Sequence, residues 1–312
     1  MTPATALRHT PQRIAPPGGA RIRPMLRTDL ERIADLRKIS YRSSDQRGFG
    51  LVHGIRGARW AVAETPKGRL TGMVGAVPLG ETGVLCHLAV LPDHRGRGLG
   101  TALSSWAVSY LQNWGAETVR LYSTARAEGL YLSLGFEPVA HRSVFRLDAA
   151  SRALVRGQEV KYEAEGRRVS RLSLRDLPEL CGLDRRSCGA NRAALILPTL
   201  RAYPGPSLVA RDAFDRINGY LLSSVADDAV RVGPFAAATP AVARALLSRV
   251  LPAMPLDSSV EVVVPGPSHS PAREVLQELG FHERQDRLRM ELGDPFAPAG
   301  IEQYGTTPYL AT

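Results

Sequence analysis

An internal repeat constrains the fold of this sequence more than any other feature. Three segments of the first half recur in the second half, in the same order and at nearly constant spacing. The aligned pairs are Met25–Ser40 with Leu172–Ser187, Arg69–Val77 with Arg216–Ser224, and Leu132–Leu147 with Gln277–Leu292. Similarity at a nearly fixed offset indicates duplicated structural units. Because 312 residues suit two units of about 150 residues, we expect two domains of one fold.

Composition marks the ends of these units. Residues 1–20 and 294–312 are rich in Pro, Gly, Ala and Thr and have no periodic apolar pattern, so we predict tails or loose straps at both ends, with a flexible tail at the N-terminus. Between the tails we place a first domain at residues 21–150, a linker at 151–167 and a second domain at 168–293.

Strand and helix patterns alternate in the first domain. Gly83–Leu91 is a nearly continuous apolar run, which is typical of a buried central strand. Apolar residues then recur at helical spacing from Leu99 to Leu111, which predicts a long helix packed on the sheet. A strand at Thr118–Thr124 and a short helix ending near Gly135 follow. The expected fold class is therefore mixed α/β.

The turn between the central strand and the long helix reads Arg95-Gly96-Arg97-Gly98-Leu99-Gly100. Glycines in such a turn let backbone N–H groups approach a ligand closely, and the start of a helix favours phosphate. Thr101 adds a hydroxyl, and the arginines can meet phosphate. Neither a Rossmann GxGxxG pattern nor a Walker loop fits this spacing.

These residues resemble motif A of the GNAT acetyltransferases, which has V-x-P ahead of [QR]-x-x-G-x-[GA]. Every position of that motif is filled, from Val90-Leu91-Pro92 to Gly100. The sequence GLYLSLGF around Tyr131 resembles the closing motif of the same family, in which a tyrosine precedes Gly-Phe by a few residues. The two motifs cover roughly residues 21–147.

The resemblance implies two α/β (α+β) GNAT-like domains, each with a mixed, largely antiparallel sheet flanked by helices. It implies that acetyl-CoA is the acyl donor and that Tyr131 protonates the departing CoA thiolate. It also implies that backbone groups of Leu88, Ala89 and Val90 bind the pantetheine arm, where the strand separates from its neighbour. The pyrophosphate would be held by Arg95, Gly96, Arg97, Gly98, Leu99, Gly100 and Thr101. An alternative is that Tyr131 is only a packing aromatic.

The second unit lacks these residues. An offset of 145 places Pro240 at the position of Arg95, Ala243 at Gly98 and Leu276 at Tyr131. Proline removes a donor N–H, and alanine crowds the approach that glycine permits. The chain thus resembles tandem-GNAT proteins that pair an intact N-terminal domain with a degenerate C-terminal one. We expect the second domain to serve in interdomain packing or, as a weaker hypothesis, in acceptor recognition.

The general base cannot be assigned from the sequence. Some GNAT enzymes carry a glutamate eleven residues before the first residue of motif A, and here that position is Val84. Glu81 and His87 are nearby candidates, but they equally fit a solvated charge and a structural histidine. A covalent acyl-enzyme on Cys86 has no visible base partner, so we favour direct transfer in a ternary complex.

Composition narrows the remaining function classes. The net charge is +10, but arginines are scattered through both halves without a basic run, so we expect no nucleic-acid partner. Three cysteines without CxxC spacing indicate neither a disulfide framework nor a metal site. No apolar run reaches the ~18 residues of a membrane span, and the first residues do not resemble a signal peptide, so we predict a cytoplasmic protein.

The acceptor and the assembly stay open. A small amine, an aminoglycoside-like compound, an amino acid and a protein N-terminus all fit a GNAT cleft. The chain is expected to be a monomer or a homodimer. The competing function is a non-catalytic acyl-CoA-binding or regulatory module, against which Tyr131 argues.

Overall fold

The computed structural model describes residues 19–40, 46–155, 168–202, 205–225, 229–255, 257–266, 270–294, 296 and 300–306. Its first half contains the elements that the sequence pattern predicts. In chain order they are β1 (Arg21–Pro24), α1 (Asp29–Arg32), α2 (Ala34–Ser40), α3 (Gln46–His53), β2 (Arg59–Glu64), β3 (Leu70–Leu79), β4 (Thr82–Val90), η2 (Pro92–His94), α4 (Leu99–Asn113), β5 (Thr118–Ser123), η3 (Ala125–Ala127), α5 (Glu128–Ser133), β6 (Glu137–Leu147) and α6 (Ala149–Val155).

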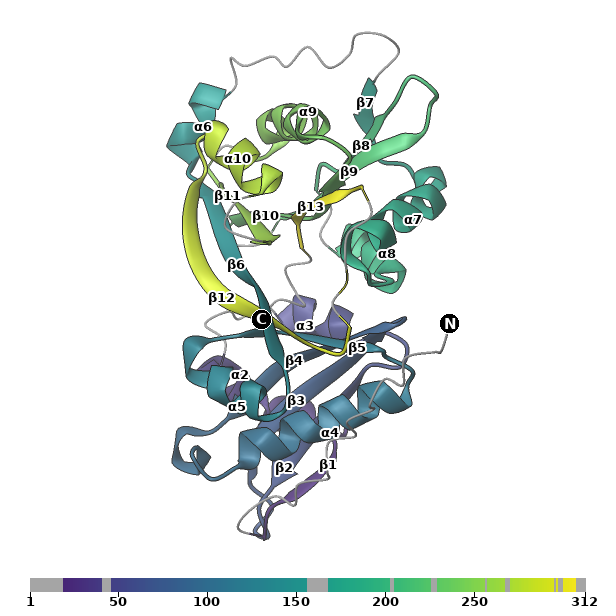
Figure 1. The fold of residues 1–312 in the computed structure, drawn as a ribbon. Helices are drawn as coiled ribbons and strands as arrows, with labels where there is room; N and C mark the ends of the chain where they lie inside the picture. Colours follow the sequence, from purple (N-terminus) through teal and green to yellow (C-terminus); the bar gives the residue numbers. More distant parts are fainter. Residues whose placement is uncertain are drawn as a thin grey trace, which may run out of the picture.

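The second half repeats this plan. Its elements are β7 (Arg168–Arg171), η4 (Leu174–Asp176), α7 (Leu177–Cys188), α8 (Ala193–Ala202), β8 (Leu208–Arg211), β9 (Ile217–Val225), β10 (Ala229–Ala237), α9 (Pro240–Val250), η5 (Leu251–Ala253), β11 (Ser259–Pro265), α10 (Pro271–Glu278), β12 (His282–Leu292) and β13 (Glu302–Gly305). Figure 1 shows the first half below the second, joined by the long strands β6 and β12.

The strands of both halves form one continuous sheet in the order β1-β2-β3-β4-β5-β12-β6-β11-β10-β9-β8-β7, with β13 paired to β10. Among the described strand pairs, only β4 with β5 and β10 with β11 are parallel. This confirms the predicted fold class of mixed, largely antiparallel sheets flanked by helices.

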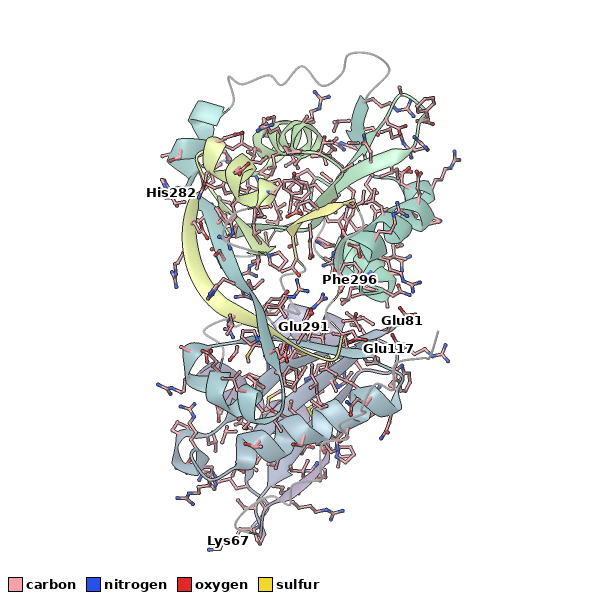
Figure 2. The ribbon with its side chains drawn as sticks, viewed as in Figure 1. Lys67, Glu81, Glu117, His282, Glu291 and Phe296 are labelled. Atoms are coloured by element: carbon pink, nitrogen blue, oxygen red, sulfur yellow. The ribbon has the colours of Figure 1, made fainter. Side chains whose placement is uncertain are left out.

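The halves exchange their last strands. β12, which ends the second repeat, lies between β5 and β6 and is antiparallel to both. β6, which ends the first repeat, in turn pairs with β11 of the second half. Figure 2 shows the consequence along β12, where His282 lies beside the second half and Glu291 lies at the junction with the first. The periodicity of a strand predicts its existence but not its partner, so the repeat alone did not predict this exchange.

The aspartates at the aligned helix starts confirm the repeat. Asp29 accepts a hydrogen bond from Leu26 N at 2.8 Å, and Asp176 accepts one from Ser173 N at 2.6 Å. Each aspartate also forms an ion pair with an arginine of a nearby strand. Both carboxylates therefore satisfy a free N–H at the start of their helical regions.

Two hydrophobic layers sandwich the strands of the first half. Helices α4 and α5 contribute the layer on one face, and β12 adds Met290 to it. Helices α2 and α3 contribute the other layer, which Cys188 and Leu195 of the second half complete. The second half therefore packs into both layers of the first, as expected for a role in interdomain packing.

The ends differ partly from the predicted tails. Residues 302–305, within the predicted C-terminal tail or strap, form β13, a strand that the sequence pattern did not predict. A strand of four residues with few apolar side chains gives no periodic signal, which explains why it was missed. Helix α6 covers the first residues of the predicted linker 151–167. Most of the predicted N-terminal tail, residues 1–18, and residues 156–167 lie outside the described residues.

Candidate active site

The glycine-rich turn connects β4 to α4 through two left-handed residues. Gly96 has φ +70° and Gly98 has φ +80°, which side chains of L-amino acids rarely adopt. Gly98 is the N-cap of α4, and a Cβ on Gly96 would meet no atom within 4 Å. The glycines are therefore required by backbone conformation, and the space beside Gly96 is open.

The first turn of α4 presents its N–H groups to this space. The first hydrogen bond at the start of the helix runs from Ala102 N to Gly98 O at 3.0 Å, so the N–H groups of residues 99–101 have no acceptor within the helix. These groups and the helix dipole form a site suited to an anion. A Cβ on Gly100 would lie 2.9 Å from Leu130 Cδ1, so this glycine lets α5 pack closely.

Strands β4 and β5 form a fork, called here the first fork. Their parallel ladder ends at Val84 and Arg120, although β4 continues to Val90. In the ladder with β3, the register shifts between the pairs that contain Cys86 and Ala89, and His87 there has φ +55°. The edge of β4 beyond Val84 therefore has no ladder partner on its β5 side among the described residues. This is the separation of strands that the GNAT resemblance implied.

The first fork opens into a cleft of about 690 Å³. Every predicted site residue lines it except Arg97, which is exposed on the turn. Arg95 also lines it, and its Nε donates to Val90 O at 2.9 Å, so this side chain ties the turn to the end of β4. The structure thus brings the turn, the unpaired edge of β4 and Tyr131 together. Three open N–H groups, a left-handed glycine turn and an unpaired strand edge suit an extended ligand with an anionic end.

Tyr131 projects from α5 into this cleft. It is buried, and its ring meets Phe136 edge to face with 5.7 Å between ring centroids. Burial raises the pKa of its phenol well above the ordinary value, while the charge of Arg287 opposes that shift. The hydroxyl is therefore protonated near neutral pH and available as a proton donor.

The two candidate bases lie in different places. His87 lines the cleft, and burial, together with the charge of Arg37, lowers its pKa to about 3, so its imidazole is neutral but a weak base. Glu81 lies in the turn between β3 and β4, is 66% exposed and forms an ion pair with Arg185 at 3.5 Å. It does not line the cleft, and Figure 2 shows it beside Glu117 at the edge of the first half.

Cys86 also lines the cleft but is buried. Burial raises the pKa of its thiol, which suppresses the thiolate that a covalent mechanism would need. Cys86 is therefore poorly suited to act as a nucleophile.

Sequence reasoning missed a second wall of the cleft. It consists of residues near the end of β5, in η3 and α5, and one residue of β12, namely Tyr122, Ser123, Thr124, Arg126, Ala127, Leu130 and Arg287. The end of β5 could have been inferred, because a fork between parallel strands has two arms. Arg287 could not, because its position depends on the exchange of β12.

The second half contains a matching fork of β10 and β11, called here the second fork. Its parallel ladder ends at Val232 and Val262. Beyond that point β13 lies in the fork, paired with β10, and Thr306 N donates to Val263 O of β11 at 2.8 Å. Helix α9 begins at Pro240, with Thr239 as its N-cap, so no glycine turn separates it from β10.

Within the described part of the chain, no helix is long and apolar enough to cross a membrane. The same residues contain no group of three or more His, Cys, Asp or Glu side chains arranged to hold a metal ion.

Comparison with known proteins agrees with this geometry. Residues 56–138 and residues 180–305 each match a family model described as an acetyltransferase (GNAT) domain. A mycothiol acetyltransferase of Beutenbergia cavernae is 34% identical over 140 residues, which cover 40% of this chain and 47% of that protein. The alignment therefore spans about half the length of this curated relative.

Solved structures share the fold over nearly the whole chain. A putative acetyltransferase from Pyrococcus horikoshii has a TM-score of 0.72 at 18% identity, covering 95% of this chain and 96% of its own. A tandem GNAT protein from the clavulanic acid biosynthesis pathway has a TM-score of 0.64 at 17% identity, covering 89% and 100%. With a GNAT domain matched in each half, the chain belongs to the GNAT acetyltransferase family and carries two such domains in tandem.

Proposed function

We propose that this chain transfers the acetyl group of acetyl-CoA directly to an amine in a ternary complex. The observation that carries the proposal is the first fork, where an anion-binding turn, an unpaired strand edge and a buried tyrosine line one cleft. Acetyl-CoA supplies the activated acyl group as a thioester. The GNAT family of the chain supports this choice of donor.

The residues of the cleft divide into three roles. The N–H groups of the Arg95–Gly100 turn and of Thr101 hold the pyrophosphate, and Arg95 adds a positive charge. The free edge of β4 at Leu88–Val90 hydrogen-bonds the pantetheine amides. Tyr131 donates a proton to the sulfur that departs.

The reaction balances without a covalent enzyme intermediate. The neutral amine forms a bond to the thioester carbonyl carbon, the C–S bond breaks, and the electron pair leaves on sulfur. The surplus proton of the amine passes to water, and the sulfur receives a proton from Tyr131. His87 has too low a pKa to hold the amine proton near neutral pH, so that proton leaves to bulk solvent, and solvent returns a proton to the Tyr131 phenolate to complete the cycle.

The acceptor is proposed to be a small-molecule amine. Because one relative is named a mycothiol acetyltransferase, the amine acceptor of mycothiol acetylation is the first compound to assay. Three free cysteines in the described residues are compatible with a reducing cytoplasm as the site of action.

An acetyl-CoA assay tests this function, with release of the CoA thiol measured over a library of amines. We expect at least one amine to stimulate release, and Tyr131→Phe to lower kcat by about 100-fold or more with unchanged acetyl-CoA affinity. Leu132→Ala, an exposed neighbour on α5, is the matched control and should retain activity. Binding of acetyl-CoA without stimulation by any amine would favour the non-catalytic acyl-CoA-binding module instead.

A further inference from the structure

Among the described residues that line the cleft of the first half, Arg287 is the one that the second half contributes. We propose that its guanidinium stabilises the negative charge that forms on the CoA sulfur when the thioester is cleaved. This role rests on the proposed transfer from acetyl-CoA. It also gives the degenerate half a part in the chemistry beyond packing.

The exchange of β12 places Arg287 at the cleft. Its neighbour Leu288 pairs with Ser123 of β5, and Arg287 itself pairs with Arg142 of β6. The ladder between β12 and β6 shifts register between Gln285 and Arg287. Such a shift re-aims the side chains beside it, and Arg287 lines the cleft together with Tyr131 and Cys86.

The next arginine along β12 has a different environment. Arg289 forms an ion pair with Glu291 at 2.6 Å, and Glu291 also pairs with Arg120 at 2.6 Å. Arg289 does not line the cleft. Arg289 is thus held in an ion pair at the junction of the halves, away from the cleft that Arg287 lines.

The charge of the cleft wall supports this assignment. No Asp or Glu lines the described cleft, and its arginines are Arg95, Arg126 and Arg287. Arg95 follows β4 and Arg126 lies in η3, so both belong to the first half. Arg287 acts on the tyrosine, because its charge favours the phenolate form of Tyr131 against the effect of burial. The CoA sulfur must lie close to this phenol to receive its proton. A cation that stabilises negative charge on the phenol oxygen therefore also stabilises negative charge on the sulfur.

Several other ionisable groups lie around Arg287. Cys86 and His87 of β4 and Tyr131 of α5 line the same cleft, and Arg142 lies opposite on β6. His87 is neutral above pH 3, and the thiol of Cys86 is held protonated by burial. Between pH 6 and 9, the thiol is therefore the titrating group that bound CoA has and bound desulfo-CoA lacks, whereas His94, which also lines the cleft, is common to both complexes.

A binding experiment isolates this charge without an acceptor. We would measure the affinities of CoA and of desulfo-CoA, which lacks the thiol, by calorimetry from pH 6 to 9. A nearby cation lowers the pKa of the bound thiol by about 1–3 units, so affinity for CoA should rise about tenfold or more with pH relative to desulfo-CoA. Arg287→Met should abolish this rise, and Arg287→Lys should retain part of it. Arg284→Met, an exposed site on the same strand, should retain all of it.

The outcomes separate this role from the function it rests on. If Arg287→Met binds desulfo-CoA with unchanged affinity, the cleft of the variant is intact. If Arg287→Met does not fold, Arg287→Lys is measured in its place. A wild-type rise that persists in Arg287→Met overturns the proposal, as does equal pH dependence of both ligands in the wild type. Failure of the wild type to bind either ligand overturns the acetyl-CoA function itself.

Discussion

The first and second forks share one backbone plan but differ in what occupies them. In both, a parallel ladder of a few residues ends and the strands diverge. In both, the strand that precedes the helix carries a register shift just beyond that point, at Cys86–Ala89 in β4 and at Val232–Phe235 in β10. The first fork opens into a cleft, whereas β13 fills the second.

In the second fork, β13 packs tightly against both strands. A Cβ on Gly305 would lie 3.2 Å from both Val232 O and Val262 Cγ1, the residues where the ladder ends. Tyr304 is fully buried, and its ring packs tilted against that of Phe235 with 5.1 Å between ring centroids. Unpaired backbone in a buried fork is costly, so each fork needs a partner. The second half uses its own chain, and we propose that the first uses the donor substrate.

Among the changes that test this comparison, removal of the second half should have the largest effect on folding and on acetyl-CoA binding. A fragment ending at residue 150 lacks β12, so β5 and β6 lose the strand between them and the α4 layer loses Met290. We expect no cooperative thermal unfolding by circular dichroism and no acetyl-CoA binding. Co-expression with residues 151–312 should restore both. A fragment that folds alone and binds acetyl-CoA would show that strand exchange is dispensable.

Loss of the β13 side chain that fills the second fork should destabilise the protein strongly. Tyr304→Ala removes a fully buried ring and should lower the free energy of unfolding by about 3–5 kcal/mol in urea denaturation. Its hydroxyl has no hydrogen-bond partner among the described residues, so Tyr304→Phe is the matched control and should change stability by less than about 1 kcal/mol. Similar losses for both variants would mean that the hydroxyl, not the filling of the fork, matters.

His87 gives the first fork a histidine-linked pH dependence with no counterpart at the aligned position of the second fork, which an offset of 147 makes Pro234. The folded pKa of His87 is about 3 against an ordinary 6.5, so the unfolded chain binds the proton first. The contribution of buried, neutral His87 to the free energy of unfolding is therefore fully present above pH 6.5 and is lost as the pH falls toward 3. At pH 5 the loss is about 2 kcal/mol. The stability difference between the wild type and His87→Gln should therefore shrink from pH 8 to 5. A constant difference would contradict this burial.

The helix starts beside the two forks should give the smallest effect. Thr239 Oγ1 accepts a hydrogen bond from Val242 N at 3.3 Å, so Thr239→Ala should cost about 1 kcal/mol and Thr239→Gly only a few tenths. At the matching cap of α4, Gly98→Ala should cost about 1–2 kcal/mol because of its left-handed backbone. Equal tolerance at both caps in thermal denaturation would show that the two turns are interchangeable.

Local patterns predicted much of this molecule. The apolar strand at Gly83–Leu91, the helix from Leu99 and the left-handed Gly135 are all present, since periodicity and glycine positions reflect short-range sterics. The Arg95–Gly100 turn and Tyr131 line one cleft, although their roles stay predictions.

Long-range features could not be predicted in this way. The insertion of β12 between β5 and β6, and the position of β13 in the second fork, depend on which distant strands pair. The sequence pattern of a short segment does not indicate its distant partner. An offset of 145 aligned Ala243 with Gly98, but the structure makes Thr239 the cap because the second connection is shorter. Arg287 was missed for the same reason as β12.

The number of acetyl-CoA molecules bound per chain tests the contrast between the forks most directly. Calorimetry should give one site, which Gly98→Trp weakens by about 100-fold or more by placing a large side chain in the turn that lines the cleft. Ala241→Trp, an exposed site in the first turn of α9, should leave that affinity unchanged. Two sites per chain, or loss of binding in Ala241→Trp with binding kept in Gly98→Trp, would contradict the assignment of the donor site to the first fork.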